Sequence, residues 1–136
     1  MELLSNPKTE FLLDASLESL HTQSVAWMNE LIFWSDEMTF FYQMLHHKKL
    51  SAAFPSSQVA TIDKELVRLN GEKLDKVKTG VASHERLLAS VYKSSSLADE
   101  QVYREAHRKL LVDMQALNQD IRTFKKKFFA FVENEV

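Results

Sequence analysis

The chain of 136 residues contains no cysteine, two glycines and two prolines. The absence of cysteine excludes disulfide bonds, thiolate metal ligands and cysteine nucleophiles. It suits a reducing compartment, so we expect a cytoplasmic protein. Tight turns depend on glycine and proline, and β-sandwiches and α/β folds need many such turns. The scarcity of both residues therefore favours a few long helices.

Long hydrophobic runs are also missing. The longest apolar run covers only residues 128–132, whereas about 20 apolar residues are needed to span a bilayer. The first residues lack the basic segment and apolar stretch of a signal peptide. The net charge of −2 provides no strong field that would attract nucleic acid or anionic membranes. We therefore expect neither a membrane span nor a nucleic-acid partner.

The apolar residues are spaced for helices that bury one face. In residues 10–50 they recur at alternating steps of four and three, which places them on one stripe of a helix. This stripe comprises Leu13, Leu17, Leu20, Ser24, Trp27, Leu31, Trp34, Met38, Phe41 and Leu45. Asn6 before Pro7 is a possible N-cap for an even earlier start. Similar spacing predicts helices over residues 57–93 and 97–133, the latter capped by Ser96.

The dipeptide Asn70-Gly71 is the one turn signal inside a predicted helix. A break there would give four helices. We favour a continuous second helix because its apolar rhythm continues through this point without a change of phase. That phase puts Lys73 on the inner stripe, where we expect it to pair with Glu30 of the first helix.

Short connections make neighbouring helices antiparallel. We therefore predict an all-α, up-down-up antiparallel three-helix bundle that forms a single domain over residues 1–136. Charge supports the pairing of the first two helices, since residues 1–50 carry three basic and seven acidic side chains, and residues 51–95 carry seven basic and five acidic ones.

Histidine and glutamate gather at one end of this bundle. Glu18 and His21 form a Glu-x-x-His motif, and level matching brings His84, Glu105 and His107 to the same height. Carboxylates and imidazoles converging from several helices build zinc and di-iron sites. A metal-binding bundle is therefore one hypothesis. The competing interpretation is that His84 is a core residue hydrogen-bonded to Glu18 or Glu105.

The first helix carries more apolar residues than one buried face can hide. Ile32, Phe33, Phe40 and Tyr42 lie beside or opposite the inner stripe. Exposed, they would form an unusually large apolar patch for a monomer. We therefore expect association with a second copy or with another helical protein. The alternative is that N-terminal apolar residues fold back over them, namely Leu3, Leu4, Phe11 and Leu12.

No arrangement typical of an enzyme is found. The sequence has no nucleophile elbow, phosphate-binding loop or dinucleotide fingerprint. We assign no catalytic residue, cofactor or small-molecule substrate, and we interpret Lys125, Lys126 and Lys127 as a solvated helix face. The function indicated is a non-catalytic interaction or structural module. A third hypothesis, a carrier of apolar ligands, requires a cavity beside Ser24 and Gly80.

Overall fold

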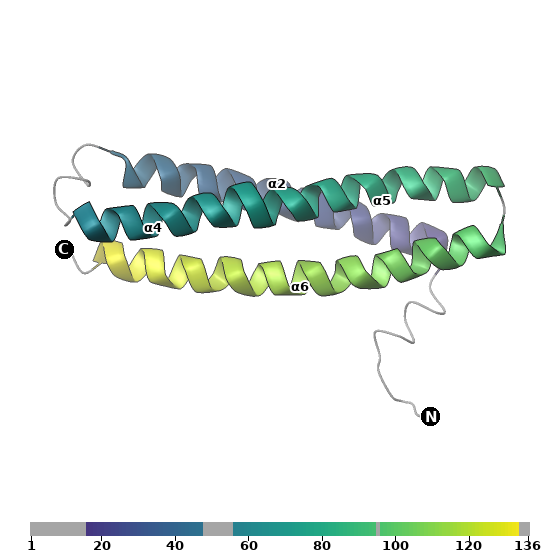
Figure 1. Ribbon diagram of the computed structural model, residues 1–136. Helices are drawn as coiled ribbons and strands as arrows, with labels where there is room; N and C mark the ends of the chain where they lie inside the picture. Colours follow the sequence, from purple (N-terminus) through teal and green to yellow (C-terminus); the bar gives the residue numbers. More distant parts are fainter. Residues whose placement is uncertain (1–15, 48–55, 95, 134–136) are drawn as a thin grey trace, which may run out of the picture. The chain divides into compact units, whose positions relative to one another are not determined.

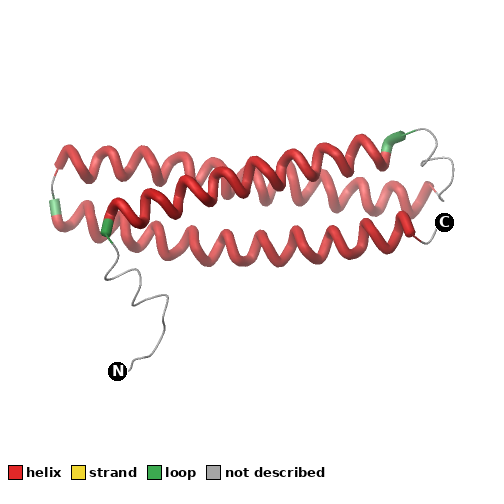
Figure 2. Tube along the Cα trace, turned by 180° about the vertical axis from the view of Figure 1, so that it is seen from behind, coloured by secondary structure: helices red, strands yellow, loops and turns green. Residues whose placement is uncertain are grey.

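The computed structural model describes residues 16–47, 56–94 and 96–133, and these are almost entirely helical (Figure 1). The elements are α2 (Leu17–Leu45), α4 (Ser56–Arg68), the π-helix η1 (Leu69–Leu74), α5 (Asp75–Ser94) and α6 (Leu97–Glu133). The described ranges contain no β-strand (Figure 2). The predicted all-α class is confirmed. No helix among these residues is long and apolar enough to cross a membrane.

Serine side chains cap two of the helices. The Ser16 hydroxyl oxygen accepts a hydrogen bond from the Ser19 N–H at 3.1 Å, so α2 begins at Leu17. The Ser96 hydroxyl oxygen accepts one from the Asp99 N–H at 3.3 Å, as the sequence predicts, and α6 has the predicted bounds. The predicted cap Asn6 and the predicted helical residues 10–15 and 48–50 lie outside the described part of the chain. Residues 16, 46 and 47 are described but are not helical, so the predicted helix over 10–50 was wrong at these positions.

Internal contacts divide the chain into two compact units, each containing a segment of every long helix. The described residues of the first are 16–29, 77–94 and 96–114, and those of the second are 30–47, 56–76 and 115–133. The prediction of a single domain over residues 1–136 stays a prediction. In the second unit, Lys73 contacts Asp120 and Lys127 contacts Glu65, so α6 runs antiparallel to the α4–η1 segment.

Helices α2 and α6 bury stripes with the same rhythm. In α2 the buried residues follow the predicted steps of four and three from Leu20 onward: Leu20, Ser24, Trp27, Leu31, Trp34, Met38, Phe41 and Leu45. In α6 the buried stripe comprises Tyr103, His107, Leu110, Met114, Leu117, Ile121, Phe124 and Phe128. The apolar spacing of the sequence also places Ala106 on this stripe, but Ala106 is only half-buried.

The second helix is continuous through Asn70-Gly71, as predicted, but its phase changes there. The N–H of Asp75 donates to the carbonyl oxygen of Asn70, five residues earlier, which is the hydrogen bond of a π-helix. One extra residue is thus accommodated in this turn. The buried residues on either side are Leu69 and Leu74, five positions apart. The prediction of an unchanged phase was wrong.

The phase change removes Lys73 from the inner stripe and puts Leu74 in its place. The Lys73 ammonium lies 2.8 Å from a carboxylate oxygen of Asp120 on α6, rather than beside Glu30 as expected. Both side chains are more than a third exposed. This ion pair therefore adds little to stability, and the predicted desolvation of a buried lysine does not arise.

Replacing Gly71 by alanine should stabilise the protein. A Cβ atom at Gly71 would meet no neighbouring atom within 4 Å, and alanine favours helix over glycine by up to about 1 kcal/mol. Gly80→Ala is the matched comparison, because its Cβ would lie 3.3 Å from a Leu110 methyl carbon. Urea unfolding should show a larger gain for Gly71→Ala. An equal or larger gain at Gly80 would contradict the open surroundings of Gly71.

Candidate functional site

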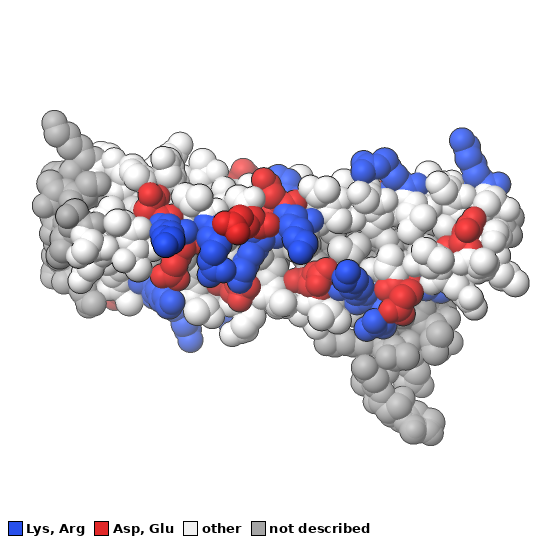
Figure 3. Space-filling model, viewed as in Figure 1, with Lys and Arg blue, Asp and Glu red and all other residues white. Residues whose placement is uncertain are grey.

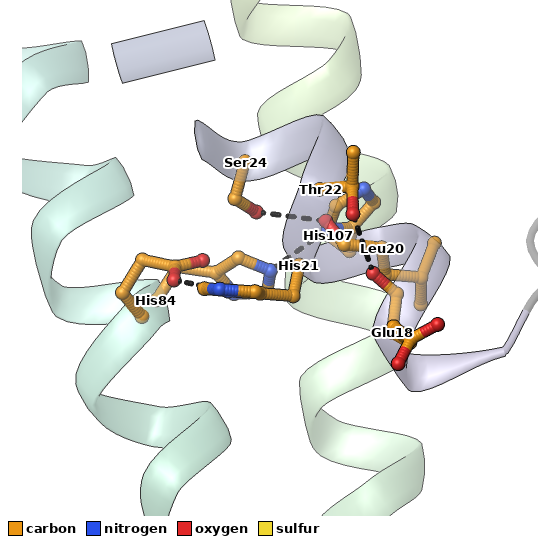
Figure 4. Close-up of polar contacts among 8 residues, drawn as sticks. Glu18, Leu20, His21, Thr22, Ser24, His84 and His107 are labelled. Carbon is orange, nitrogen blue, oxygen red and sulfur yellow. Dashed lines mark hydrogen bonds and ion pairs between the residues drawn. The ribbon is translucent and has the colours of Figure 1, made fainter. Parts of the chain in front are cut away.

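Two buried histidines join the helices of the first unit. His84 of α5 and His107 of α6 lie with Nε2 of the first 2.9 Å from Nδ1 of the second. Figure 4 shows the two side chains in this contact, with Ser24 of α2 close by. His107 Nε2 also lies 2.7 Å from the Gln23 side-chain oxygen of α2. One hydrogen-bonded chain thus links all three helices.

The hydrogen-bond partners fix where the protons lie. The amide oxygen of Gln23 can only accept, so His107 donates its Nε2–H to Gln23. A neutral His107 then accepts at Nδ1, and His84 donates its Nε2–H to it. His84 Nδ1 is left as a buried acceptor with no hydrogen-bond partner among the described residues. Both rings are neutral in this arrangement.

The surroundings of the pair oppose its protonation. Burial lowers the pKa of His84 from 6.5 to about 4. Burial, with smaller contributions from neighbouring His84 and Arg104, likewise lowers the pKa of His107 to about 4. Aromatic rings cover both imidazoles: Trp27 stacks on His107 at 4.5 Å, and Tyr103 stacks on His84 at 4.2 Å with ring planes 2° apart.

Ser24 and Tyr103 complete the buried polar cluster of this unit. The Ser24 hydroxyl donates to the carbonyl oxygen of Leu20 at 3.2 Å, one turn earlier in α2. Burial, and to a smaller extent the Glu85 carboxylate, raise the pKa of Tyr103 to about 12. Both hydroxyls are therefore neutral across the physiological range. The cluster holds no charged nucleophile.

Of the five residues considered as metal ligands, the structure brings only His84 and His107 together. His21 instead pairs with Glu85, with Nδ1 2.6 Å from a carboxylate oxygen. Glu18 is exposed. Glu105 is also exposed and bonds Arg108 one turn along α6, and this contact lowers the pKa of Glu105. Within the described ranges, no three histidine, aspartate or glutamate side chains are placed to hold one metal ion.

The space required for an apolar ligand beside Gly80 is occupied. The position of a Cβ on Gly80 lies 3.3 Å from a methyl carbon of Leu110, so this side chain packs directly on the glycine. Ser24 is fully buried. We therefore do not propose a ligand carrier on the basis of these two residues.

The second unit presents large apolar side chains to solvent. Phe33 and Phe40 of α2 are 57% and 59% exposed, and Phe129 of α6 is 46% exposed. The Phe41 ring lies close to two of them, 6.0 Å from the Phe40 ring and 5.6 Å from the Phe129 ring. We call Phe33, Phe40 and Phe129 the exposed aromatic patch.

The other two predicted interface residues of α2 are also exposed but are not part of this patch. Ile32 is 46% exposed. Tyr42 lies beside His46, with ring centres 4.3 Å apart, and it lines a groove of about 260 Å³ with Val67 and Gly71. The alternative that residues 3–12 cover these side chains concerns residues outside the described part of the chain.

The lysine run of α6 is largely paired across helices. Lys125 lies 2.8 Å from Glu37 of α2, and Lys127 lies 3.3 Å from Glu65 of α4. Figure 3 shows acidic and basic side chains intermingled on the face that it draws. The charges on this face therefore do not form the one-sign surface that nucleic acid would require.

Comparison of the chain with known protein families, curated protein sequences and solved structures gave no match. The histidine pair and the aromatic patch are the two arrangements that bear on function. The histidine pair is closed to solvent and consists of neutral groups that bond one another, so it suits a structural link between helices. The aromatic patch is exposed to solvent, so it suits recognition.

Three residues of these arrangements, Gln23, Tyr103 and Phe129, were not identified from the sequence. Tyr103 belongs to the buried stripe of α6, four positions before His107. This spacing continues the rhythm that leads to Leu110, so the signal was present in the sequence. Phe129 could not be assigned in the same way, because adjacent Phe128 is buried and only the packing shows which ring faces solvent.

Proposed function

We propose that this protein is a non-catalytic, self-associating interaction module and that the exposed aromatic patch is its contact surface. The observation that carries the proposal is the exposure of more than half of Phe33 and of Phe40 on one side of α2. These residues are seven positions apart, so they lie on the same helix face. Exposure of two phenylalanine side chains to water is unfavourable, and contact with a second copy buries them.

The arrangement of the patch also supports recognition. Aromatic side chains with little conformational freedom are favoured as interface anchors. Phe40 and Phe129 are held by contact with Phe41, which is itself buried. The patch is therefore largely formed before a partner arrives, and ordering it on binding costs little entropy.

Charging the patch should dissociate the protein without unfolding it. We expect the double variant Phe33→Glu, Phe40→Glu to be monomeric in sedimentation velocity at micromolar concentrations at which the unsubstituted chain sediments as a dimer. Its helical circular dichroism and thermal midpoint should be close to those of the unsubstituted chain, because both substituted positions are exposed.

The matched control places the same charges on exposed apolar positions of the other unit. Tyr92 and Val112 are 58% and 51% exposed, and the variant Tyr92→Glu, Val112→Glu should sediment like the unsubstituted chain. Dissociation by this control, or an unchanged dimer after the patch is charged, would contradict the assignment of the contact surface.

A further inference from the structure

The exposed aromatic patch has an acidic side and a basic side. On α2, residues Glu30, Phe33, Glu37 and Phe40 follow one another at steps of three and four and share a face. Helix α2 contains no lysine or arginine. On α6, residues Arg122, Lys126 and Phe129 share a face in the same way, and no acidic residue lies between Arg122 and Phe129. Along its own helix, each phenylalanine thus has charged neighbours of one sign.

Two contacts fix how α2 and α6 are aligned in this unit. Glu37 pairs with Lys125, 88 positions later, and Phe41 contacts Phe129, which is also 88 positions later. The two helix segments are therefore parallel, and residues separated by 88 lie at equal height. Asp36 of α2 accordingly lies between the heights of Arg122 and Lys126, and Phe40 lies within one residue of the height of Phe129.

A symmetric dimer through this patch has two possible orientations. Its two-fold axis lies in the contact plane and runs either along the helices or across them. An axis along the helices puts α2 of one copy on α6 of the other and preserves the heights. An axis across them puts α2 on α2 and α6 on α6. In the second orientation, acidic side chains face acidic ones and basic side chains face basic ones.

We propose that two copies pair through the exposed aromatic patch about a two-fold axis parallel to these helices, with α2 of each copy on α6 of the other. This inference rests on the proposed self-association. It brings Phe40 to the height of the partner's Phe129 and Asp36 between the partner's Arg122 and Lys126. Opposite charges then meet at both edges of the contact, which favours this orientation over the alternative.

Charge reversal distinguishes the two orientations. One variant carries Asp36→Lys and another carries Arg122→Glu with Lys126→Glu. All three positions are exposed, and the Glu37–Lys125 pair within the chain is left intact. We expect each variant to dimerise at least about tenfold more weakly than the unsubstituted chain, because like charges then face each other. Sedimentation equilibrium measures the dissociation constants, and circular dichroism checks folding.

Combining the reversed charges should restore binding. A chain with all three substitutions should dimerise within about threefold of the unsubstituted chain, and an equimolar mixture of the two weakened variants should form heterodimers. If the axis runs across the helices, each reversed charge faces either its own copy or a residue of opposite sign on the same helix of the other chain, so neither variant would dimerise more weakly. That result overturns the orientation but not the patch. A monomeric unsubstituted chain would instead refute the proposed function.

Discussion

Acidification from pH 7 to pH 4 should lower the free energy of unfolding by about 3 to 6 kcal/mol through His84 and His107 alone. Each imidazole has its pKa lowered from 6.5 to about 4, and lowering a pKa by one corresponds to about 1.4 kcal/mol. Below pH 6.5 the unfolded chain binds protons that the folded chain does not. Stability is therefore fully present above pH 6.5 and is lost as the pH falls toward 4.

Urea unfolding at a series of pH values measures this loss. The variant His84→Gln, His107→Gln has no titrating group at the two positions, so its stability should change much less between pH 6.5 and pH 5. His47→Gln, which alters an exposed histidine, should keep the full dependence. Equal slopes for the double variant and the unsubstituted chain in this range would show that the pair does not control acid stability.

Deleting Gly71 should leave the protein folded, with a thermal midpoint equal to or above that of the unsubstituted chain. The π-helix η1 holds one residue more than an α-helical turn. Removing one residue there allows a regular α-helix in which Leu69 and Leu74 are separated by four positions, and the buried stripes before and after keep their faces. Circular dichroism and thermal unfolding measure the outcome.

Deleting Asn29 from α2 is the matched control and should abolish the fold. Asn29 is exposed, but α2 has no π-helical turn to absorb the change, so all later residues rotate by about 100°. Leu31, Trp34, Met38, Phe41 and Leu45 then leave the core. Losing even a few such side chains, at about 2 to 5 kcal/mol each, exceeds the stability of an ordinary domain. A cooperative melt of this variant, or collapse of the Gly71 deletion, would contradict the assigned registers.

The sequence predicted the helices and the core of α2 well because both depend on local spacing. Leu20 to Leu45 are buried in the order that steps of four and three require. The predicted third helix agrees with α6 for a similar reason, since the Ser96 cap is a local feature. The π-helix was missed because a single added residue leaves the apolar spacing nearly regular, and Lys73 and Leu74 are adjacent alternatives for one buried position.

The sequence correctly placed the histidines at one level along the helices, but it did not identify which residue each of them contacts. His84 and His107 meet, whereas Glu105 turns to Arg108 on its own helix and His21 turns to Glu85. Side chains at one level of a bundle can face inward or outward. Sequence spacing alone does not decide which of several neighbouring side chains on a helix faces the core. The stacking of Trp27 and Tyr103 on the imidazoles depends on packing between helices, so no local pattern predicts it.

The sequence predicted exposed apolar side chains on the first helix from their number, and not from the position of each residue. A helix with apolar residues around most of its circumference cannot bury all of them in one bundle, and Phe33 and Phe40 are indeed exposed. The contribution of Phe129 from α6 required the three-dimensional structure. Phe129 extends the patch from α2 to α6, so the patch has acidic neighbours on one helix and basic neighbours on the other. The proposed dimer depends on these opposite charges.

Sedimentation equilibrium of the unsubstituted chain over a wide micromolar range tests self-association most directly. We expect the apparent mass to rise from that of one 15.8 kDa chain toward twice that value and then to level off, since a closed two-fold contact admits no third copy. A mass that stays at one chain across the whole range would contradict the account.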